Sequence, residues 1–271
     1  MNYRHAFHAG NHGDCLKHAV LVWLLRAMQR KPAGFLFLDT HAGIGRYDLE
    51  SGPASRTGEW RQGIARLLAA APSALADWLA LVRASSPTYP GSPALAAMLA
   101  RPQDRLALCE LHPQDAAALR AAFHRLRHVG VHERDGWEAL RALLPAPERR
   151  ALVLIDPPYE AEEEMAMLAA GMAAARARMP GAVIAAWLPL KHRAPQVALL
   201  GDLAQRGIRD LVLAELALRP PLDPARLNGS AMLIAGPPFG WEDGLAPVLA
   251  ALAGVLAEPD GGWTLRRVAD E

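Results

Sequence analysis

The clearest chemical pattern in the sequence is Asp156-Pro157-Pro158-Tyr159, directly after the apolar run Ala151–Ile155. Such a run is typical of a buried strand, so the tetrapeptide is expected at the strand's carboxyl end, where open α/β sheets bind ligands. It offers a carboxylate, a backbone carbonyl and an aromatic ring. That combination suits a planar amine.

The amino group of adenine is such an amine, and it is a poor nucleophile because its lone pair is delocalised into the ring. Hydrogen bonds from both of its N–H groups favour a pyramidal nitrogen, and the Asp156 carboxylate and the Pro157 carbonyl can accept them. The Tyr159 ring can stack on the base, which contributes about 1–3 kcal/mol. Attack on a sulfonium methyl leaves an acidic nitrogen, so the catalytic Asp156 has to orient it rather than act as a strong base.

The competing interpretation of this tetrapeptide is a turn that only ends a strand. Pro-Pro also occurs at 220–221 and 237–238, which shows that the pair alone carries little information. Neither of those pairs follows an acid or precedes a tyrosine, so catalysis is the favoured interpretation of 156–159.

Three further predicted strands end in an acidic residue, at Asp39, Glu110 and Asp135. Glu110 is placed to accept both ribose hydroxyls of a nucleoside, and Asp135 with Gly136 can pair with an adenine amino group. A single acid at a strand end is usually a solvated turn residue. Four in succession, with Asp156, predict one nucleoside site along the sheet edge.

The loop after the first strand carries Gly43 and Gly45, which let the backbone approach a cofactor. A dinucleotide fingerprint has a third small residue where Asp48 stands, and an acid that ends a strand about twenty residues later. Neither feature occurs, so a dehydrogenase remains an alternative only through the two glycines.

Apolar runs predict seven strands, at 34–39, 105–110, 129–133, 151–155, 182–187, 211–218 and 231–235. Helical patterns such as 113–127 and 162–178 alternate with most of them, which is typical of a doubly wound, mostly parallel α/β sheet. The last two strands are joined by a short polar stretch, so we expect an antiparallel hairpin at one sheet edge. The long interval after the first strand predicts a helical insertion at about 47–97, since a βα unit needs about thirty residues.

The composition suits one large α/β domain over 1–271, since 52% of the residues are hydrophobic and 21% are charged. Cys15 and Cys109 lack the spacing of a disulfide framework or a metal knuckle, so we expect a reducing, cytoplasmic environment. We expect no leader and no membrane span, because no apolar run reaches the required length of about 20 residues. The net charge of +1 indicates no general affinity for polyanions.

Cations do cluster in the first 31 residues, where Asp14 is the single acid. Asp14 is predicted to cap a helix that ends before Pro32. One interpretation is an ordinary solvated helix face. The favoured one is a substrate strap with its helix at about 1–31, in which Tyr3, His5 and Lys17 position a flipped base.

Histidines in the same stretch raise the question of a metal site. His8 and His12 have four-residue spacing, but Gly10, Asn11 and Gly13 disfavour a helix there. We therefore expect no metal.

Several motifs together resemble a known family. They are 3–12, Leu16-Lys17-His18, 38–43, Pro90-Gly91-Ser92-Pro93, Glu110-Leu111-His112-Pro113 and 155–159. They closely resemble the bacterial large-subunit ribosomal RNA adenine-N6 methyltransferases of the methyltransferase J family, and the resemblance spans nearly the whole chain.

The resemblance implies a class I Rossmann-like methyltransferase that uses S-adenosyl-L-methionine (S-adenosylmethionine) to methylate 23S ribosomal RNA. Tyr3 and Lys17 would lie beside the target base, and Asp156 would be the catalytic acceptor. The implied cofactor contacts are His18, His41, Ser92, Glu110, Asp135, Gly136 and Asp156.

Two other functions remain open at this point. A DNA adenine-N6 methyltransferase is the enzyme alternative, because Asp-Pro-Pro-Tyr does not separate DNA from RNA. An RNA-binding module with a vestigial cofactor pocket is the non-enzyme alternative. No motif encodes the oligomeric state, for which a monomer is the expectation.

Overall fold

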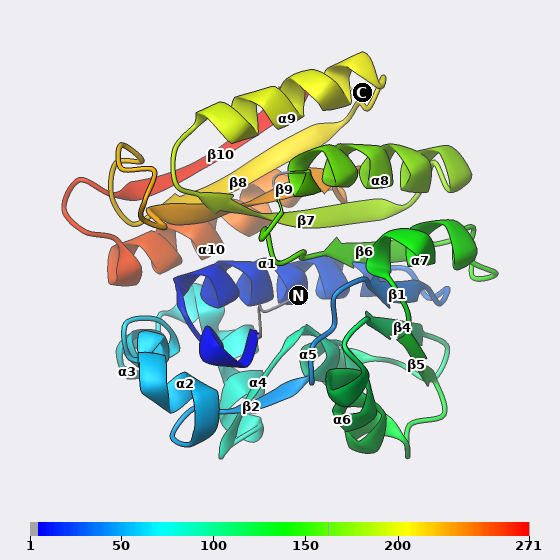
Figure 1. Ribbon diagram of the computed structural model, residues 1–271, viewed down its shortest axis with the longest axis horizontal. Helices are drawn as coiled ribbons and strands as arrows, with labels where there is room; N and C mark the ends of the chain where they lie inside the picture. Colours follow the sequence, from blue (N-terminus) through cyan, green and yellow to red (C-terminus); the bar gives the residue numbers. More distant parts are fainter. Residues whose placement is uncertain (1–4, 162, 271) are drawn as a thin grey trace.

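The computed structural model describes residues 5–161 and 163–270, and Tyr3 and Arg4 of the predicted strap lie outside these ranges. One large sheet is at the centre of the fold (Figure 1). Its strands are β1 (Leu36–Asp39), β4 (Arg105–Glu110), β5 (Val129–Glu133), β6 (Ala151–Ile155), β7 (Val183–Leu190), β8 (Leu211–Ala217), β9 (Gly229–Ala235) and β10 (Gly262–Ala269).

Their order in the sheet is β10-β8-β9-β7-β6-β1-β4-β5. Strands β7, β6, β1, β4 and β5 are parallel to one another. Strand β9 is antiparallel to β7, β8 is antiparallel to β9, and β10 is antiparallel to β8. Asp39 is in register with Leu108 of β4 and Leu154 of β6. The strand ends that carry the predicted acids therefore meet at one edge of the sheet, as the doubly wound fold requires.

Two details of the predicted sheet are wrong. The sheet has eight strands within the described ranges, not seven, because β10 was not recognised. Arg266 and Arg267 interrupt any apolar run in it, and its residues are partly exposed at the sheet edge. The hairpin of β8 and β9 is antiparallel as predicted, but β10 covers it, so the hairpin is not at the edge.

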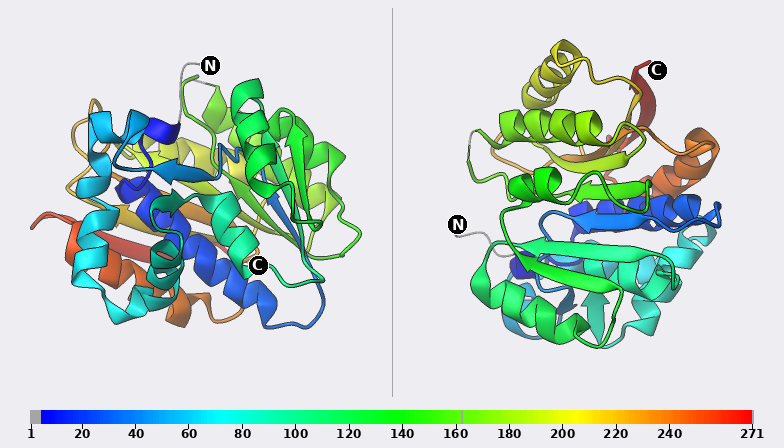
Figure 2. Two further views of the ribbon diagram at one scale, coloured as in Figure 1. Left: turned by 90° about the horizontal axis from the view of Figure 1, so that it is seen from below. Right: turned by 90° about the vertical axis from the view of Figure 1, so that its right-hand side faces the viewer.

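The helices form a layer on each face of the sheet (Figure 2). Side chains of α1, α5, α6 and α10 share one hydrophobic cluster with Phe37 of β1, and those of α7, α8 and α9 share the other with Leu36 and Leu38. These helices are α1 (His12–Gln29), α5 (Ser92–Leu99), α6 (Pro113–Phe123), α7 (Gly136–Ala142), α8 (Glu164–Arg178), α9 (Ala194–Gln205) and α10 (Trp241–Leu256).

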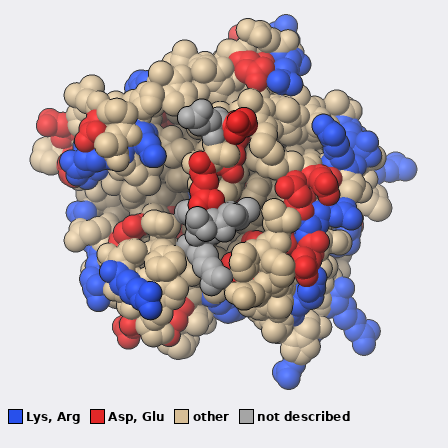
Figure 3. Space-filling view, in the orientation of Figure 1, with Lys and Arg blue, Asp and Glu red and all other residues tan. Residues whose placement is uncertain are grey.

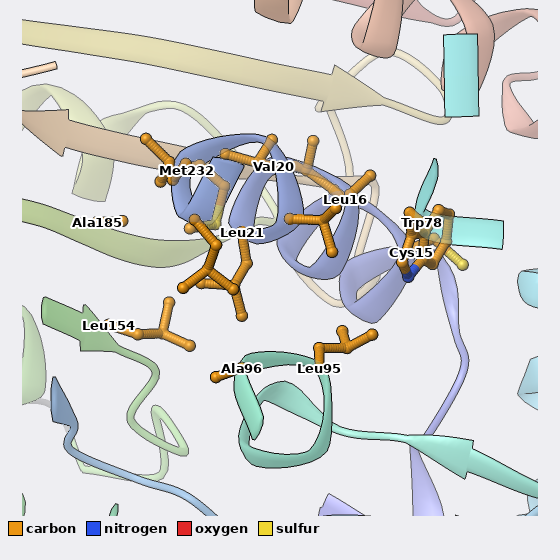
Figure 4. Packing of buried hydrophobic residues seen from close by; sticks show 14 of the residues in the cluster. Cys15, Leu16, Val20, Leu21, Trp78, Leu95, Ala96, Leu154, Ala185 and Met232 are labelled. Atoms are coloured by element: carbon orange, nitrogen blue, oxygen red, sulfur yellow. The ribbon is translucent and has the colours of Figure 1, made fainter. Parts of the chain in front are cut away.

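Helix α1 lies inside the protein rather than on its surface. Figure 4 shows its Leu16, Val20 and Leu21 between the sheet and α5. The polar residues Asp14 and Lys17 are only 2% and 4% exposed because they lie on this buried helix. A solvated helix face is therefore excluded for this part of the basic cluster.

The predicted cap of α1 is also wrong. Asn11 is the N-cap, and its side-chain oxygen accepts the Asp14 backbone N–H at 3.0 Å. Asp14 lies in the first turn, so its carboxylate is available for other partners. His12 and Gly13 are helical despite the neighbouring glycine, because Asn11 satisfies the helix start.

The segment between β1 and β4 combines a small sheet with short helices. Strands β2 (Arg46–Asp48) and β3 (Thr88–Pro90) pair antiparallel. Between them lie α2 (Gly52–Thr57), η2 (Glu59–Arg61), α3 (Ile64–Ala70), η3 (Ser73–Leu75) and α4 (Ala76–Ala84). Ile64, Leu67, Trp78 and Leu79 attach this segment to the cluster that contains α1.

Within residues 5–161 and 163–270, no single helix is long and apolar enough to cross a membrane. One bent pair, Glu59–Ala70 with Ser73–Ala84, passes by length and composition alone and turns by 110°.

Candidate active site

Two cavities meet at the carboxyl end of β6. The strand-end cavity, of about 430 Å³, is lined by His41, Gly43, Glu110, Asp135 and Trp137 among others. The N-terminal cavity, of about 1280 Å³, is lined by His8, Lys17, Tyr159, Trp187 and Lys191 among others. Asp156, Pro158 and His5 line both cavities. The Asp156 side chain can thus contact a ligand in either cavity.

Glu110 is fixed on the wall of the strand-end cavity by two backbone donors. One carboxylate oxygen accepts the Gly43 N–H at 2.8 Å and the other accepts the His112 N–H at 2.8 Å. The loop after β1 and the loop after β4 are tied together by this carboxylate. Each oxygen retains acceptor capacity, which suits a pair of vicinal hydroxyls.

Asp135 is the N-cap of α7 on the same wall. Its Oδ1 accepts the N–H groups of Trp137 at 2.8 Å and Glu138 at 3.0 Å. A Cβ at Gly136 would lie 2.3 Å from the Thr40 carbonyl oxygen, so the loops after β1 and β5 approach too closely for any side chain there. Gly136 is thus required for the shape of the cavity.

His41 lines the strand-end cavity as a neutral imidazole. Burial lowers its pKa to about 4, although Asp156 and Asp135 act in the opposite direction. Its Nδ1 is hydrogen-bonded to Thr40 Oγ1 at 2.8 Å, and its ring meets Trp137 edge-on. The orientation of this ring is therefore determined by the protein before any ligand binds.

Asp39, at the end of β1, is fully buried and lies behind the cavity wall. Ser92 Oγ donates to its Oδ2 at 2.7 Å. Burial raises the pKa of Asp39 to about 7, which Ser92 opposes and the nearby Asp156 reinforces. Asp39 holds α5 against β1 through Ser92 and does not line either cavity.

Two of the predicted cofactor contacts lie away from the walls of both cavities. His18 is 1% exposed, and its Nδ1 is hydrogen-bonded to the Tyr89 hydroxyl at 2.7 Å. Ser92 is 7% exposed and engages Asp39. Their contact with a cofactor stays a prediction, whereas His41, Glu110, Asp135, Gly136 and Asp156 all line the strand-end cavity.

A buried chain of charges leads to Asp156 from the N-terminal segment. Lys17 Nζ lies 2.5 Å from Asp156 Oδ2 and 2.8 Å from Asp14 Oδ1. Burial alone would lower the pKa of Lys17, but the two carboxylates outweigh it and raise that pKa well above its ordinary value. Lys17 thus stays cationic, fixes one oxygen of Asp156 and leaves the other for a ligand.

The tyrosine of the tetrapeptide is anchored through its hydroxyl. Tyr159 O–H donates to the Trp187 carbonyl at 2.5 Å, and the two rings are tilted with centroids 5.9 Å apart. Pro157 and Tyr159 line the N-terminal cavity and not the strand-end cavity. The predicted substrate contacts Pro157, Tyr159 and Lys17 therefore share one cavity, and His5 lies at its border.

Asp14 is the residue of the site whose role was not recognised in the sequence. Its carboxylate accepts the Gly10 N–H at 2.9 Å, is hydrogen-bonded to His5 Nε2 at 3.0 Å and forms an ion pair with Lys17 at 2.8 Å. Burial raises the pKa of Asp14, but His5, Lys17 and His18 together outweigh burial, and this pKa is well below its ordinary value. The available signal was the three-residue spacing of Asp14 and Lys17 on one helix face.

The strand-end cavity fits the nucleoside end of S-adenosylmethionine. Its volume lies in the usual range of small-molecule sites, about 300–1,000 Å³. Glu110 offers oriented acceptors of the kind that ribose hydroxyls require, and Ile44, Leu111 and Trp137 supply apolar walls. Among the residues that the structure describes, no group of three or more histidine, cysteine or acidic side chains could hold a metal ion.

This fold and site define an S-adenosylmethionine-dependent methyltransferase of the Rossmann-like class. The sheet has acids at the ends of β1, β4, β5 and β6, and Asp-Pro-Pro-Tyr lies between a nucleoside-sized cavity and a larger one.

The family follows from comparison with known proteins. The family model described as ribosomal RNA large subunit methyltransferase D, RlmJ, matches residues 32–269. The protein named ribosomal RNA large subunit methyltransferase J from Escherichia coli (strain K12) is 39% identical over 97% of this chain and 96% of its own length. Its namesake from Haemophilus influenzae is 37% identical over 100% of both chains. This chain belongs to that family.

A solved structure agrees in fold. The crystal structure of a protein from Legionella pneumophila str. Philadelphia 1 is 30% identical in sequence and superimposes with a TM-score of 0.89, covering 96% of this chain and 98% of that one.

Proposed function

We propose that this protein transfers the methyl group of S-adenosylmethionine to the N6 amino group of an adenine in 23S ribosomal RNA. The observation that carries the proposal is the position of Asp156 on the wall of both cavities. A methyl donor in the strand-end cavity and a base in the N-terminal cavity would face each other across this carboxylate.

On the cofactor side, the chain supplies orientation. Glu110 would accept the ribose hydroxyls, while Asp135 and Gly136 would border the adenine ring, and neutral His41 would contact the remainder of the molecule without adding positive charge. When bound, S-adenosylmethionine supplies an electrophilic methyl group.

On the substrate side, the amino group would donate one hydrogen bond to Asp156 and one to the Pro157 carbonyl. Lys17 occupies Oδ2 of Asp156, so Oδ1 is the oxygen that meets the base. Tyr159, held by its hydroxyl, offers an aromatic surface beside the base. Because the methylated nitrogen is acidic, an oriented carboxylate suffices to take up the proton or pass it to water.

The family favours RNA as the substrate, and two basic side chains at the N-terminal cavity suit a nucleic acid in general. On the face shown in Figure 3, acidic side chains gather near the centre, and lysine and arginine side chains lie towards the edges. Lys191 and Arg66 line the N-terminal cavity and suit phosphates that flank an inserted base.

A substrate of this kind implies action in the cytoplasm. The expected oligomeric state stays a monomer, which light scattering can test.

Methyl transfer by the purified protein tests the proposal. Unmodified 23S RNA, assembled large subunits and a deoxy oligonucleotide of matched sequence are each incubated with S-adenosylmethionine, and nucleosides are identified by mass spectrometry. N6-methyladenosine formed in RNA is the expected result. Methylation confined to DNA would establish the alternative substrate. If calorimetry detects no binding of S-adenosylmethionine, the protein is not an enzyme of this class.

A further inference from the structure

The N-terminal segment is held from outside by the inserted segment after β1. The blue N-terminal turn η1 (His5–Phe7) lies beside α2 (Figures 1 and 2). Thr57 Oγ1 donates to the Phe7 carbonyl at 2.5 Å, and the Ile64 N–H donates to the Gly10 carbonyl at 2.9 Å. Two backbone carbonyls of residues 5–11 are thus hydrogen-bonded to the inserted segment.

Glu59 adds a side-chain fastening between those two hydrogen bonds. Its carboxylate is hydrogen-bonded to His8 Nδ1 at 3.0 Å and accepts the Asn11 amide N–H at 2.9 Å. The bond to Glu59 raises the pKa of His8, which favours a charged pair.

The two segments also approach as closely as backbone permits. A Cβ at Gly63 would lie 2.2 Å from the Gly10 oxygen, and Gly10 has a φ of +77° with Ile64 2.9 Å from its hypothetical Cβ. No side chain fits between them, so the relative position of Gly10 and Gly63 is fixed by close contact.

From inside, the same residues are tied to the catalytic carboxylate. Asp14 binds the Gly10 N–H and His5, and it pairs with Lys17, which pairs with Asp156. His5 lines both cavities, and His8 and Asn11 line the N-terminal one. A shift of residues 5–11 would therefore change the cavity that receives the base.

We propose that Thr57, Glu59, Gly63 and Ile64 form a clasp that holds residues 5–11 over the N-terminal cavity, and that Glu59 is a positioning residue for methyl transfer to RNA. The proposal rests on the proposed function for its catalytic consequence. It gives the insertion a task distinct from cofactor binding, since none of the four clasp residues lines the strand-end cavity.

The experiment compares Glu59→Ala with Asp77→Ala in the full chain. Asp77 is a matched control, because it also lies in the insertion and pairs with a residue of α1, Arg26 at 2.8 Å, but lines neither cavity. Glu59→Gln keeps one acceptor for the Asn11 amide, so it should show a smaller loss of RNA methylation than Glu59→Ala. Three quantities are measured: amide hydrogen exchange of residues 5–11, methyl-transfer kinetics on 23S RNA, and S-adenosylmethionine affinity.

The clasp predicts faster exchange of 5–11 in Glu59→Ala but not in Asp77→Ala. It also predicts that kcat/KM for RNA falls at least about tenfold, because small misplacements of reacting groups are costly. S-adenosylmethionine affinity should change less than about twofold in each variant, and Asp77→Ala should match the unmodified protein.

Two failures are distinguishable. A Glu59→Ala variant with normal exchange of 5–11, or with normal RNA kinetics while the unmodified protein is active, overturns the clasp. If the unmodified protein methylates no RNA, the proposed function is wrong. The hydrogen exchange of residues 5–11 in Glu59→Ala then still shows whether the clasp holds this segment. A fall in cofactor affinity equal to the fall in RNA turnover would show a general structural role and overturn the positioning role.

Discussion

The two cavities that meet at Asp156 are built in different ways. Around the strand-end cavity, acids at strand ends are held by backbone N–H groups of the loops at this edge of the sheet, as Glu110 and Asp135 are. Around the N-terminal cavity, side chains are held by other side chains far away in sequence. Lys17 and Asp156 are 139 residues apart, and His8 and Glu59 are 51 apart.

The difference indicates which cavity we expect to be common to many methyltransferases and which to be particular to one substrate. A cavity built on strand ends follows from the sheet order alone and suits a cofactor common to many enzymes. A cavity assembled from an N-terminal segment, an insertion and the loop after β7 can be changed without disturbing the sheet. Variants should therefore separate cofactor binding from substrate turnover, except at Asp156.

Asp156→Ala should have the largest effect because this residue belongs to both cavities. Loss of the oriented acceptor is expected to lower methyl transfer by about 10²–10⁴-fold. Differential scanning calorimetry should give a melting temperature close to that of the unmodified protein. Retention of more than a few per cent of turnover, with normal melting, would show that Asp156 is not catalytic.

Deletion of residues 1–8 should break the N-terminal cavity and disturb the strand-end cavity less, because His5 and Ala6 lie on its wall but Glu110, Asp135 and Gly136 remain. The contacts of His5 with Asp14 and of His8 with Glu59 are lost, so turnover on RNA is expected to fall by about 10²-fold. S-adenosylmethionine affinity, measured by titration, should fall little. If truncation lowers the melting temperature and reduces both functions equally, the segment is only a structural strap.

Glu110→Ala should do the reverse. A charge-assisted hydrogen bond to a ribose hydroxyl contributes roughly 1.5–3 kcal/mol, so the loss of even one should lower S-adenosylmethionine affinity by about 10–100-fold. RNA affinity, measured by filter binding, should hardly change. Glu110→Gln is the control for loss of loop structure, because its amide oxygen can still accept the N–H of Gly43 or His112. Unaltered cofactor affinity would contradict the ribose contact.

Asp39→Asn should give the smallest effect, on stability alone. The unfolded Asp39 loses its proton near its ordinary pKa of 3.8, and the folded one loses it near about 7. The unmodified protein is therefore destabilised progressively as pH rises between these values, and the variant is not. The advantage of the variant in melting temperature should grow from pH 4 to 7 and reach a few degrees.

A control with the opposite sign is available for that measurement. Arg26 lowers the pKa of Asp77, so the unmodified pair stabilises the fold above the pKa of the unfolded carboxyl. Asp77→Asn should lose that small contribution as pH rises. A pH-independent difference for Asp39→Asn would show that its carboxyl is not buried as described.

Local sequence patterns predict the strand ends of the strand-end cavity but not the contacts that hold the N-terminal cavity together, for a physical reason. An apolar run that ends in an acid is a local pattern, so β1, β4 and β6 and their terminal acids could be located without three-dimensional information. The clasp around Glu59 and the pairing of Lys17 with Asp156 have no local pattern, because only the folded chain brings these residues together. Strand β10 was missed because its edge position tolerates Arg266 and Arg267.

Nucleoside mass spectrometry of ribosomal RNA from a strain that lacks this gene tests the central claim most directly. The account predicts that one N6-methyladenosine disappears from 23S RNA, returns when the unmodified gene is supplied, and does not return with Asp156→Ala. A 23S modification pattern that is the same with and without the gene would contradict it.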